Sequence, residues 1–340
     1  VQFDKILLNE TLKSVLKTYS ESVANRSDDA YKEQTNVIFD MILKKYIDSE
    51  KTTVLLLDGI LNTFPFDLFR KNATYTKPFI RLNNLRQNIY SPQKNTAKTI
   101  VFAPHFVENT DSKYAVELPS SYKEATAIEE VTNATMKTGE LALKQTFIET
   151  SNAYDIIHLT THSEVDLELP LQSKILFYAE KNKPSSEYIL KVKSLYDMSF
   201  SADLVTLSSC KSGGGTNESG KGLQSIANAF HYAGAKSTVM SLWDVPDNTT
   251  AIIMGLFYEN LKTGVDKATA LLHAKEMYLA QTDDENFRHP YYWAGFVISG
   301  DISPIVFPET SNTYYYVFAI ILVLFVSWML YKRRKMTKLS

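Results

Sequence analysis

The sequence predicts an α/β fold built on a mostly parallel sheet with helices on both faces. Short runs of Val, Ile, Leu and Thr recur along the chain, and segments with apolar residues at helical spacing separate them. Strands that alternate with helices are typical of parallel sheets, because each helix carries the chain back to the start of the next strand. With 340 residues, 44% of them hydrophobic, the chain is long enough to bury the core that such a sheet requires.

Helices are predicted where apolar side chains recur three or four residues apart. The polar run 25–29 separates the first two helices, and Ser120, Ser121 and Glu124 form a capping box at the start of the third. The predicted helices cover residues 3–24, 30–47, 122–136, 145–151, 191–198, 223–233, 248–262 and 265–280.

Strands are predicted where a short aliphatic run ends at a polar or glycine-containing segment. Asp58 and Gly59 form a turn after the first run, and the acidic residues 164–168 follow the third. The predicted strands cover residues 52–58, 98–104, 154–159, 173–178, 203–208, 236–243 and 291–298.

Charge and cysteine content exclude two classes of protein. The formal net charge of −2 and the scattered Lys and Arg residues argue against a nucleic-acid partner, because affinity for phosphate backbones depends on clustered cations. The exception is a basic run at 332–335, near the end of the chain. A single cysteine excludes an internal disulfide framework.

Two reactive side chains follow two of the predicted strands. Cys210, the single cysteine, comes just after the strand at 203–208, and His162 comes after the strand at 154–159. Ligands and catalytic groups collect at the carboxyl ends of strands in open α/β sheets. A nearby imidazole lowers the pKa of a thiol and protonates a leaving amine, so the two residues are a candidate catalytic pair. Their separation of 48 residues is close to the roughly 50 residues between the His and Cys of caspases.

Three other interpretations of these segments stay open at this point. A cysteine after an apolar strand is often a small buried hydrophobe. His158, His162 and Cys210 have the side chains of a metal site, although a second clustered pair of ligands is missing from the sequence. The run Lys211–Gly222 contains five glycines but lacks the Gly-Lys-Ser/Thr ending of a phosphate-binding loop. We interpret it as a substrate-gating loop beside the candidate nucleophile.

Several segments, in order, resemble a known family. They are Thr53–Phe69, Ile157-His-Leu-Thr-Thr-His162, Leu207-Ser-Ser-Cys-Lys-Ser-Gly213, Ser241-Leu-Trp-Asp-Val-Pro-Asp247 and Tyr291–Ile298. Together they resemble the signatures of the CHAT family. These are caspase-like cysteine peptidase domains that are related to separases and often attached to tetratricopeptide repeats. The resemblance extends from about residue 35 to about residue 300.

The resemblance implies roles for three residues. Cys210 would be the nucleophile and His162 the general base and acid of a cysteine endopeptidase. The backbone N–H groups of Ser163 and Cys210 would form the oxyanion hole. The family usually has glycine after the histidine, so Ser163 is a departure that bears on catalytic efficiency. The resemblance implies no metal and no other cofactor.

Three residues near the end of the strand at 236–243 are candidates for substrate binding. In the caspase-like architecture, the loop after this strand borders the pocket for the residue before the scissile bond. Asp244 or Asp247 in that pocket would pair with an Arg or Lys side chain of the substrate. Trp243 would line the pocket or fill the core, and the segment 244–247 also suits the N-cap of the helix that follows.

The C-terminal region has the pattern of a membrane span. Residues 314–331 carry no charge, have Tyr and Trp near their ends, and precede the basic run 332–335. This pattern predicts a single transmembrane helix with a cytoplasmic tail. The sequence begins at Val1 without a signal peptide, so we expect it to be the C-terminal part of a longer chain. In a bacterium the peptidase domain would then face the periplasm; a cytoplasmic, tail-anchored arrangement is the alternative.

The predicted organisation has five parts. They are an N-terminal helical segment that would end a helical repeat array (1–34), a CHAT caspase-like peptidase domain (35–303), a linker (304–313), a transmembrane helix (314–331) and a basic cytoplasmic tail (332–340). We expect a membrane-anchored cysteine endopeptidase that cleaves protein or peptide substrates under the control of a regulatory protein partner. The alternative is a catalytically inactive scaffold for protein–protein interaction or signalling. A redox sensor is disfavoured, because no second cysteine is present to resolve an oxidised Cys210.

Overall fold

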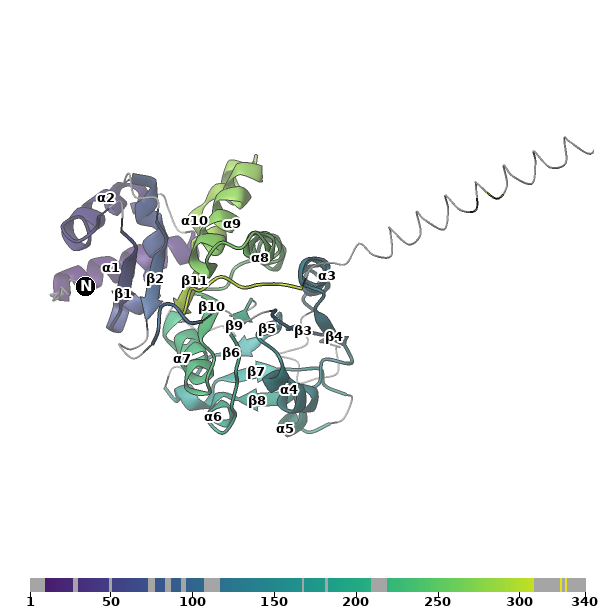
Figure 1. Cartoon of the computed structure of the whole chain (residues 1–340). Coiled ribbons are helices and arrows are strands. Elements are labelled where there is room, and N and C mark those ends of the chain that lie inside the picture. Colours follow the sequence, from purple (N-terminus) through teal and green to yellow (C-terminus); the bar gives the residue numbers. More distant parts are fainter. Residues whose placement is uncertain are drawn as a thin grey trace, which may run out of the picture. The chain divides into compact units, whose positions relative to one another are not determined.

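The computed structural model describes most of the chain. The described residues are 10–26, 30–48, 51–72, 77–82, 87–92, 96–106, 117–166, 168–180, 183–208 and 219–308, together with Phe325 and Trp328. The chain divides into two compact units, Val1–Phe307 and Pro308–Ser340. The fold and the candidate site belong to the first unit (Figure 1).

Helices and strands alternate along much of the first unit. The helices are α1 (Glu10–Asn25), α2 (Ala30–Ile42), α3 (Ser121–Thr132), α4 (Lys144–Thr150), α5 (Ser185–Tyr188), α6 (Val192–Leu195), α7 (Ser219–Tyr232), α8 (Asp247–Lys262), α9 (Lys267–Gln281) and α10 (Pro290–Trp293). The strands are β1 (Thr53–Leu56), β2 (Phe79–Leu82), β3 (Thr99–Pro104), β4 (Thr135–Gly139), β5 (Ile156–Leu159), β6 (Ser163–Glu164), β7 (Lys174–Leu176), β8 (Ile189–Lys191), β9 (Leu204–Leu207), β10 (Ser237–Ser241) and β11 (Phe296–Gly300).

The central sheet has eight strands and consists of two parallel blocks. Its strand order is β1-β2-β11-β10-β9-β5-β3-β4. The larger block contains β10, β9, β5, β3 and β4, and the smaller block contains β1, β2 and β11. The blocks meet where β11 pairs antiparallel with β10. The predicted α/β fold with a mostly parallel sheet is therefore confirmed. A separate antiparallel sheet contains β6, β7 and β8.

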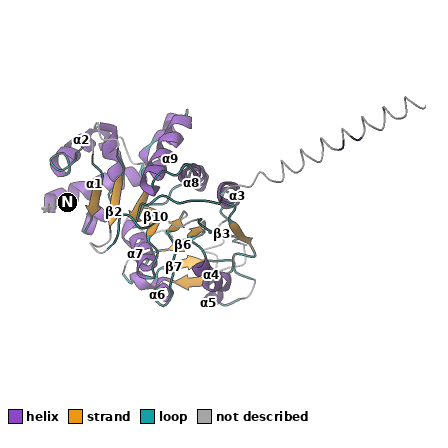
Figure 2. Ribbon diagram, viewed as in Figure 1, coloured by secondary structure: helices purple, strands orange, loops and turns teal. Residues whose placement is uncertain are grey.

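Helices cover both faces of the central sheet. Figures 1 and 2 show α3, α8 and α9 on one side and α4, α6 and α7 on the other. On the second side, the ring of Phe147 in α4 lies 5.5 Å from Phe102 of β3 and 6.5 Å from Phe230 of α7, measured between centroids. Burying these large rings stabilises the packing of α4 and α7 on the strands.

A second aromatic cluster joins α1 to the smaller block. The ring centroids of Tyr19 and Phe64 are 5.3 Å apart, and those of Phe64 and Phe69 are 5.2 Å apart. Both pairs are stacked, and all three side chains are completely buried. Aromatic packing therefore supports both blocks of the sheet, within one continuous hydrophobic core.

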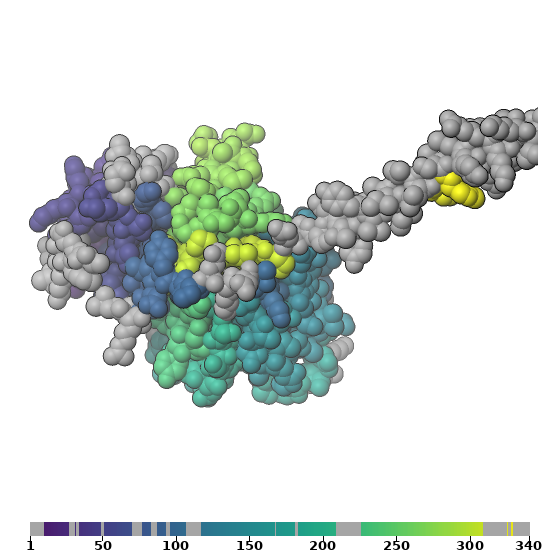
Figure 3. Space-filling view, viewed as in Figure 1, coloured from purple at the N-terminus to yellow at the C-terminus, as the bar shows by residue number. Residues whose placement is uncertain are grey.

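The segment after β11 runs along the edge at which β10 and β3 begin. The N–H of Asp301 donates to the carbonyl of Lys236 at 2.9 Å, and the N–H of Ala97 donates to the carbonyl of Val306 at 2.7 Å. Figure 3 shows this segment as a yellow band across the visible face. The residues that follow β5, β9 and β10 leave the sheet at its opposite edge.

Most predicted elements are present, but several differ from the prediction. The helix predicted over 122–136 ends at Thr132, because Asn133 adopts the left-handed conformation (φ 53°) and β4 starts two residues later. The strand predicted over 291–298 starts only at Phe296, after the helical turn α10. The strand predicted over 173–178 is β7 of the separate sheet. Strands β2, β4, β6 and β8 were not predicted.

The predicted transmembrane helix lies largely outside the described residues. Of residues 314–331, only Phe325 and Trp328 are described; both are helical, and their ring centroids are 6.1 Å apart. The tail at 332–340 also lies outside the described residues. Among the helices that the structure describes, none combines the length and the apolar composition needed to cross a membrane.

Candidate active site

The carboxyl ends of three neighbouring strands lie at one edge of the larger block. Strand β5 runs parallel to β9, with Leu159 opposite Leu207, and β9 runs parallel to β10, with Leu207 opposite Met240. His162 follows β5, and Trp243 follows β10. Residues predicted from separate segments of the sequence are thus brought to one edge, the position at which α/β sheets usually bind ligands.

Cys210 and residues 211–218 lie outside the described residues. Ser208 is the last described residue after β9. Its N–H donates to the carbonyl of Leu159 at 3.1 Å, and its hydroxyl donates to the same oxygen at 3.3 Å. The chain therefore leaves β9 directly beside the end of β5. The end of the predicted glycine-rich loop, from Ser219 on, belongs to α7.

The backbone around His162 is bonded to two neighbouring strands. The N–H of Thr160 donates to the carbonyl of Phe102 in β3 at 3.0 Å, and the N–H of Leu176 in β7 donates to the carbonyl of His162 at 2.9 Å. The hydroxyl of Thr161 donates to the carbonyl of Leu176. Hydrogen bonds thus hold the backbone at His162 and at the two residues before it. His162 itself is only 4% exposed.

The ring of Phe106 packs against the imidazole of His162. Their centroids are 4.4 Å apart, and their planes are inclined by 48°. Phe106 is buried in a small apolar cluster with Leu118 and Leu176. It was not predicted as a site residue, and its only signal in the sequence is an aromatic side chain two positions after Pro104, at which β3 ends. The contact fixes the imidazole against an apolar wall.

Ser163, the candidate oxyanion donor, is the first residue of β6 and pairs with Ile175 of β7. Among the described residues other than glycine, only Arg26 and Asn133 have a positive φ. Ser163 therefore adopts a backbone conformation that any L-residue reaches without strain. Serine in place of the usual glycine costs no backbone strain at this position.

Trp243 packs into the core after β10. It is 5% exposed, and its indole N–H donates to the carbonyl of Tyr291 at 2.7 Å. A Cβ atom added at Gly295 would lie 2.9 Å from the indole ring, so glycine is needed there for the backbone to approach the ring. Of the two roles considered for Trp243, this geometry corresponds to filling the core.

The two aspartates after β10 have different environments. Oδ2 of Asp247 accepts a hydrogen bond from the N–H of Ser120 at 2.6 Å, which joins the start of α8 to the start of α3. The N-cap of α8 is Pro246, which lies in the predicted segment 244–247, but no side chain forms a capping hydrogen bond there. Asp244 is half-buried. Burial raises the pKa of the Tyr291 hydroxyl, and the charge of Asp244 raises it further.

Glu124 and His158 lie in the core beside this edge. The predicted capping box is wrong: Ser120 makes no side-chain capping bond, and Glu124 is 1% exposed. Instead, Oε1 of Glu124 lies 2.7 Å from Nε2 of His158, which is completely buried. Within the part of the chain that the structure describes, no group of three or more His, Cys, Asp or Glu side chains is arranged to hold a metal ion.

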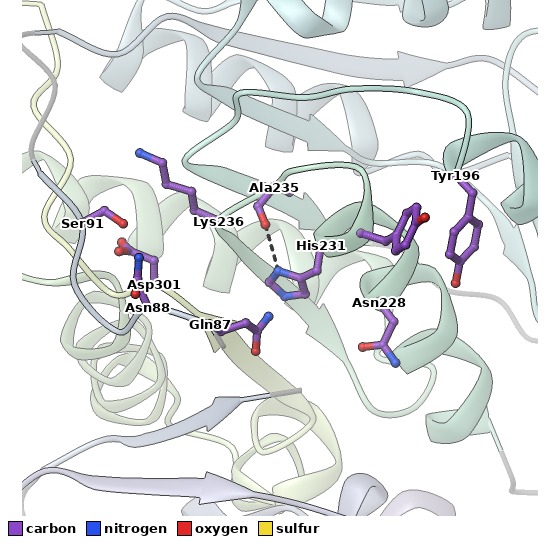
Figure 4. A pocket seen from close by; sticks show the side chains of 10 residues that line it. Gln87, Asn88, Ser91, Tyr196, Asn228, His231, Ala235, Lys236 and Asp301 are labelled. Atoms are coloured by element: carbon purple, nitrogen blue, oxygen red, sulfur yellow. Dashed lines mark hydrogen bonds between the residues drawn. The ribbon is translucent and has the colours of Figure 1, made fainter. Parts of the chain in front are cut away.

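A pocket of about 470 Å³ lies at the other edge of the sheet, where β10 begins and β11 ends. Figure 4 shows Lys236 and Asp301 on one side of it, Tyr196 on the other and His231 between them. Nδ1–H of His231 donates to the carbonyl of Ala235 at 2.9 Å. Burial lowers the pKa of His231 to about 4, so its imidazole is neutral at neutral pH. The pocket includes none of the predicted site residues.

Comparisons with known proteins give one family and two long relatives. A sequence model of the CHAT domain matches residues 32–301. The chain is 27% identical over 213 residues to tetratricopeptide repeat protein 28 of Mus musculus, covering 54% of this chain and 8% of that protein. It is 23% identical over 302 residues to the Homo sapiens protein of the same name, covering 75% of this chain and 12% of that protein. The chain thus spans a small part of these relatives.

Two solved structures are similar to this chain, with low sequence identity. The complex of the pro- and mature domains of RgpB from Porphyromonas gingivalis has a TM-score of 0.48 at 9% identity, covering 88% of this chain and 78% of that one. The Saccharomyces cerevisiae separase–securin complex has a TM-score of 0.45 at 12% identity, covering 81% of this chain and 18% of that one.

Proposed function

The chain belongs to the CHAT family, and we propose that it is a cysteine endopeptidase with Cys210 as the nucleophile and His162 as the general base and acid. The observation that carries the proposal is the parallel pairing of β5 with β9, which puts the described ends of the two strands side by side. Cys210 comes two residues after Ser208, and His162 comes three residues after Leu159. Cys210 and His162 are therefore each only a few residues from the end of one of two paired strands, at the same edge of the sheet.

In the proposed reaction, the thiolate of Cys210 attacks the carbonyl carbon of the scissile peptide bond. The backbone N–H groups of Cys210 and Ser163 donate to the oxyanion that forms. The His162 imidazolium gives its proton to the leaving amine, and a thioester remains on Cys210. His162 then takes a proton from a water molecule that attacks the thioester, which releases the carboxylic acid and regenerates the Cys210 thiolate and the His162 imidazolium. No cofactor takes part.

We propose Asp244 as the group that selects a basic side chain before the scissile bond. Its half-buried carboxylate follows β10, the neighbour of β9 in the sheet. A carboxylate in such a place favours Arg or Lys through a charge-assisted hydrogen bond. Asp247 and Trp243 would support the wall of this pocket, because their polar atoms bond to Ser120 and Tyr291.

The sequence supports a membrane anchor, and the relatives support a regulatory partner. Residues 314–331 would span a membrane once, with the peptidase domain on the non-cytoplasmic, periplasmic side and the basic tail in the cytoplasm. The relatives are named for tetratricopeptide repeats and are much longer than this chain. This supports control of cleavage by a repeat region or by a protein partner.

A catalytically inactive scaffold for protein–protein interaction is the second candidate function. The observation in its favour is the burial of His162, which is 4% exposed and packs against Phe106. A general acid must reach the leaving amine within hydrogen-bond distance. In a scaffold, the imidazole would stay buried against Phe106 and Cys210 would have no partner in catalysis.

Labelling with peptide acyloxymethyl ketones separates these functions, because the reagents require both an activated thiolate and a fitting pocket. The full chain is treated with reagents that end in Arg, Lys, Leu or Asp, and modification of Cys210 is followed by mass spectrometry. The peptidase predicts labelling that His162→Ala abolishes and a preference for Arg or Lys that Asp244→Asn removes. A folded chain that is not labelled, and whose Cys210 reacts slowly with iodoacetamide, would support the scaffold.

A further inference from the structure

A chain of buried polar side chains connects the two strands that lead to the candidate dyad. Nε2 of His158 in β5 lies 2.7 Å from Oε1 of Glu124 in α3, and Nδ1 lies 3.2 Å from the hydroxyl of Tyr258 in α8. That hydroxyl lies 3.3 Å from Oγ1 of Thr206 in β9. All four residues are at most 1% exposed.

Glu124 has a second contact that reaches closer to His162. The hydroxyl of Thr160 donates to Oε2 of Glu124 at 3.3 Å, so the carboxylate contacts two residues of the segment that runs from β5 to His162. Thr160 is also bonded through its N–H to β3. On the other strand, Thr206 comes four residues before Cys210.

The donors in this network of buried polar side chains can be identified from the groups that accept their hydrogen bonds. Burial raises the pKa of Tyr258, so its hydroxyl stays protonated and can donate. A carboxylate only accepts, so Nε2 of His158 carries the proton that Glu124 accepts. Nδ1 of His158 lies within hydrogen-bond distance of the Tyr258 hydroxyl, so both ring nitrogens have a partner. Every member of the chain has a partner, as buried polar groups require.

Stability alone does not explain these side chains. Replacing a buried ion pair or polar pair by apolar residues of similar volume is often neutral or stabilising. A satisfied polar network orients particular atoms more strictly than an apolar core does, because its hydrogen bonds are directional. In this fold, the atoms so held belong to the strand segments that lead to His162 and Cys210.

We propose that Glu124 is a positioning residue, which through His158, Thr160 and Tyr258 holds the ends of β5 and β9 in the geometry that the candidate dyad needs. The role for catalysis rests on the proposed peptidase function. A displacement of about 1 Å at a reacting group can cost roughly a hundredfold in rate, so modest loosening of these ends has a measurable effect. None of the four residues contacts the substrate in this account.

The test uses a double variant, Glu124→Leu/His158→Leu, with Glu130→Gln on the exposed side of α3 as the matched control. The double variant should fold with a Tm near that of the wild type, and its Cys210 should be labelled by the Arg ketone roughly ten- to a hundredfold more slowly. Amide hydrogen exchange at residues 160–163 should accelerate. A folded double variant with wild-type labelling and wild-type exchange would overturn the proposal.

Tyr258→Phe keeps the test decisive if the double variant does not fold. It removes one hydroxyl and both of its contacts, to His158 and to Thr206. Faster exchange at residues 160–163 and 204–208 is expected, and exchange equal to that of the wild type would overturn the proposal. Failure of the proposed function is distinguished by the wild-type chain: if its Cys210 is not labelled, the peptidase proposal fails, and the exchange measurements still decide whether the network holds the strand ends.

Discussion

The two blocks of the central sheet both bury ionisable side chains, but of different kinds. In the smaller block, Lys275 of α9 is 2% exposed, forms an ion pair with Asp67 and donates to the carbonyl of Phe296 at 2.5 Å. Arg81 of β2 is 7% exposed and donates to the carbonyl of Phe64 at 2.5 Å. Burial lowers the pKa of Arg81 to about 10, which leaves it charged at neutral pH.

In the larger block, the buried groups are Glu124, His158 and Tyr258, which lie beside the candidate site. Lys275 donates to the carbonyl of Phe296 in β11, and Arg81 donates to the carbonyl of Phe64 in the segment before β2. These bonds tie a helix and a connecting segment to the strands, which is a contribution to stability. An imidazole between a carboxylate and a phenol instead orients the strand ends that carry the candidate dyad. We therefore expect substitutions in the smaller block to change stability, and substitutions near the site in the larger block to change activity.

The largest effect is expected in the larger block, at His162. His162→Ala should lower the rate of peptide hydrolysis by roughly 10²- to 10⁴-fold, the range for loss of a general acid–base residue. The measurement is kcat/KM on a fluorogenic peptide with Arg before the scissile bond, and circular dichroism confirms folding. A folded variant that cleaves at the wild-type rate would show that His162 is not the catalytic base.

The next effect is expected at a buried ion pair where the smaller block meets the larger one, because Lys267 also donates to the carbonyl of Asp203, just before β9. Nζ of Lys267 lies 3.1 Å from Oδ1 of Asp301, with side chains 1% and 3% exposed. Lys267→Met leaves a buried carboxylate without its cation, so the free energy of unfolding should fall by about 3–5 kcal/mol. Hydrolysis per folded molecule should not change.

Lys44→Met is the control for this prediction. Lys44 pairs with Asp40 on the surface, with side chains 64% and 55% exposed, and its loss should cost at most about 1 kcal/mol. Urea denaturation measures both variants. Equal losses of stability in the two variants would show that the buried ion pair contributes no more to folding than the exposed one.

A smaller effect is expected at His231, next to the junction of the blocks. Its pKa is lowered by burial to about 4, whereas an unfolded chain has about 6.5. The unfolded chain therefore binds more protons between these values, so the stabilisation is complete above about pH 6.5 and is lost as the pH falls toward 4. The slope from this residue is at most about 1.4 kcal/mol per pH unit.

His231→Gln should flatten this pH dependence of the free energy of unfolding relative to the wild type. His105→Gln, at a histidine whose side chain is 63% exposed, is the control for loss of an imidazole that is not buried. Denaturation between pH 4 and pH 7 gives both profiles. If His231→Gln and the wild type lose stability in parallel, the buried imidazole is not the source of the slope.

The smallest effect is expected at Phe106. Phe106→Leu keeps an apolar side chain but removes the ring that packs on His162, so Cys210 labelling should slow by roughly two- to tenfold. Stability should change by less than about 1.5 kcal/mol. Faster labelling in this variant would contradict a supporting role and would show that Phe106 covers the imidazole.

Periodicity in the sequence predicted the long elements well. The helices predicted at 248–262 and 265–280 are α8 and α9, with ends shifted by at most two residues, because their apolar side chains recur over four turns. Strand β4 was missed because Thr135–Gly139 lies at the edge of the sheet and has no apolar run. The helix before it was consequently predicted too long.

Two contacts near the site, those of Glu124 and Phe106, could not be predicted from the local sequence. A Ser-x-x-Glu pattern is the same whether the carboxylate caps a helix or is buried, and the partner of Glu124 is 34 residues away in β5. Phe106 likewise meets His162 only through the pairing of β3 with β5. The positions of His162 and Cys210 after strands were predicted from the sequence, whereas the order of those strands in the sheet is a tertiary property.

If neighbouring strands bring His162 against Cys210, the imidazole changes how the alkylation rate of Cys210 by iodoacetamide depends on pH. We expect the wild-type thiol to react at pH values well below 8.5, the ordinary pKa of cysteine, because a nearby imidazolium stabilises the thiolate. In His162→Ala, the midpoint should rise to about 8.5. Identical profiles with midpoints at or above about 8.5 in both chains would show that His162 does not lie beside Cys210.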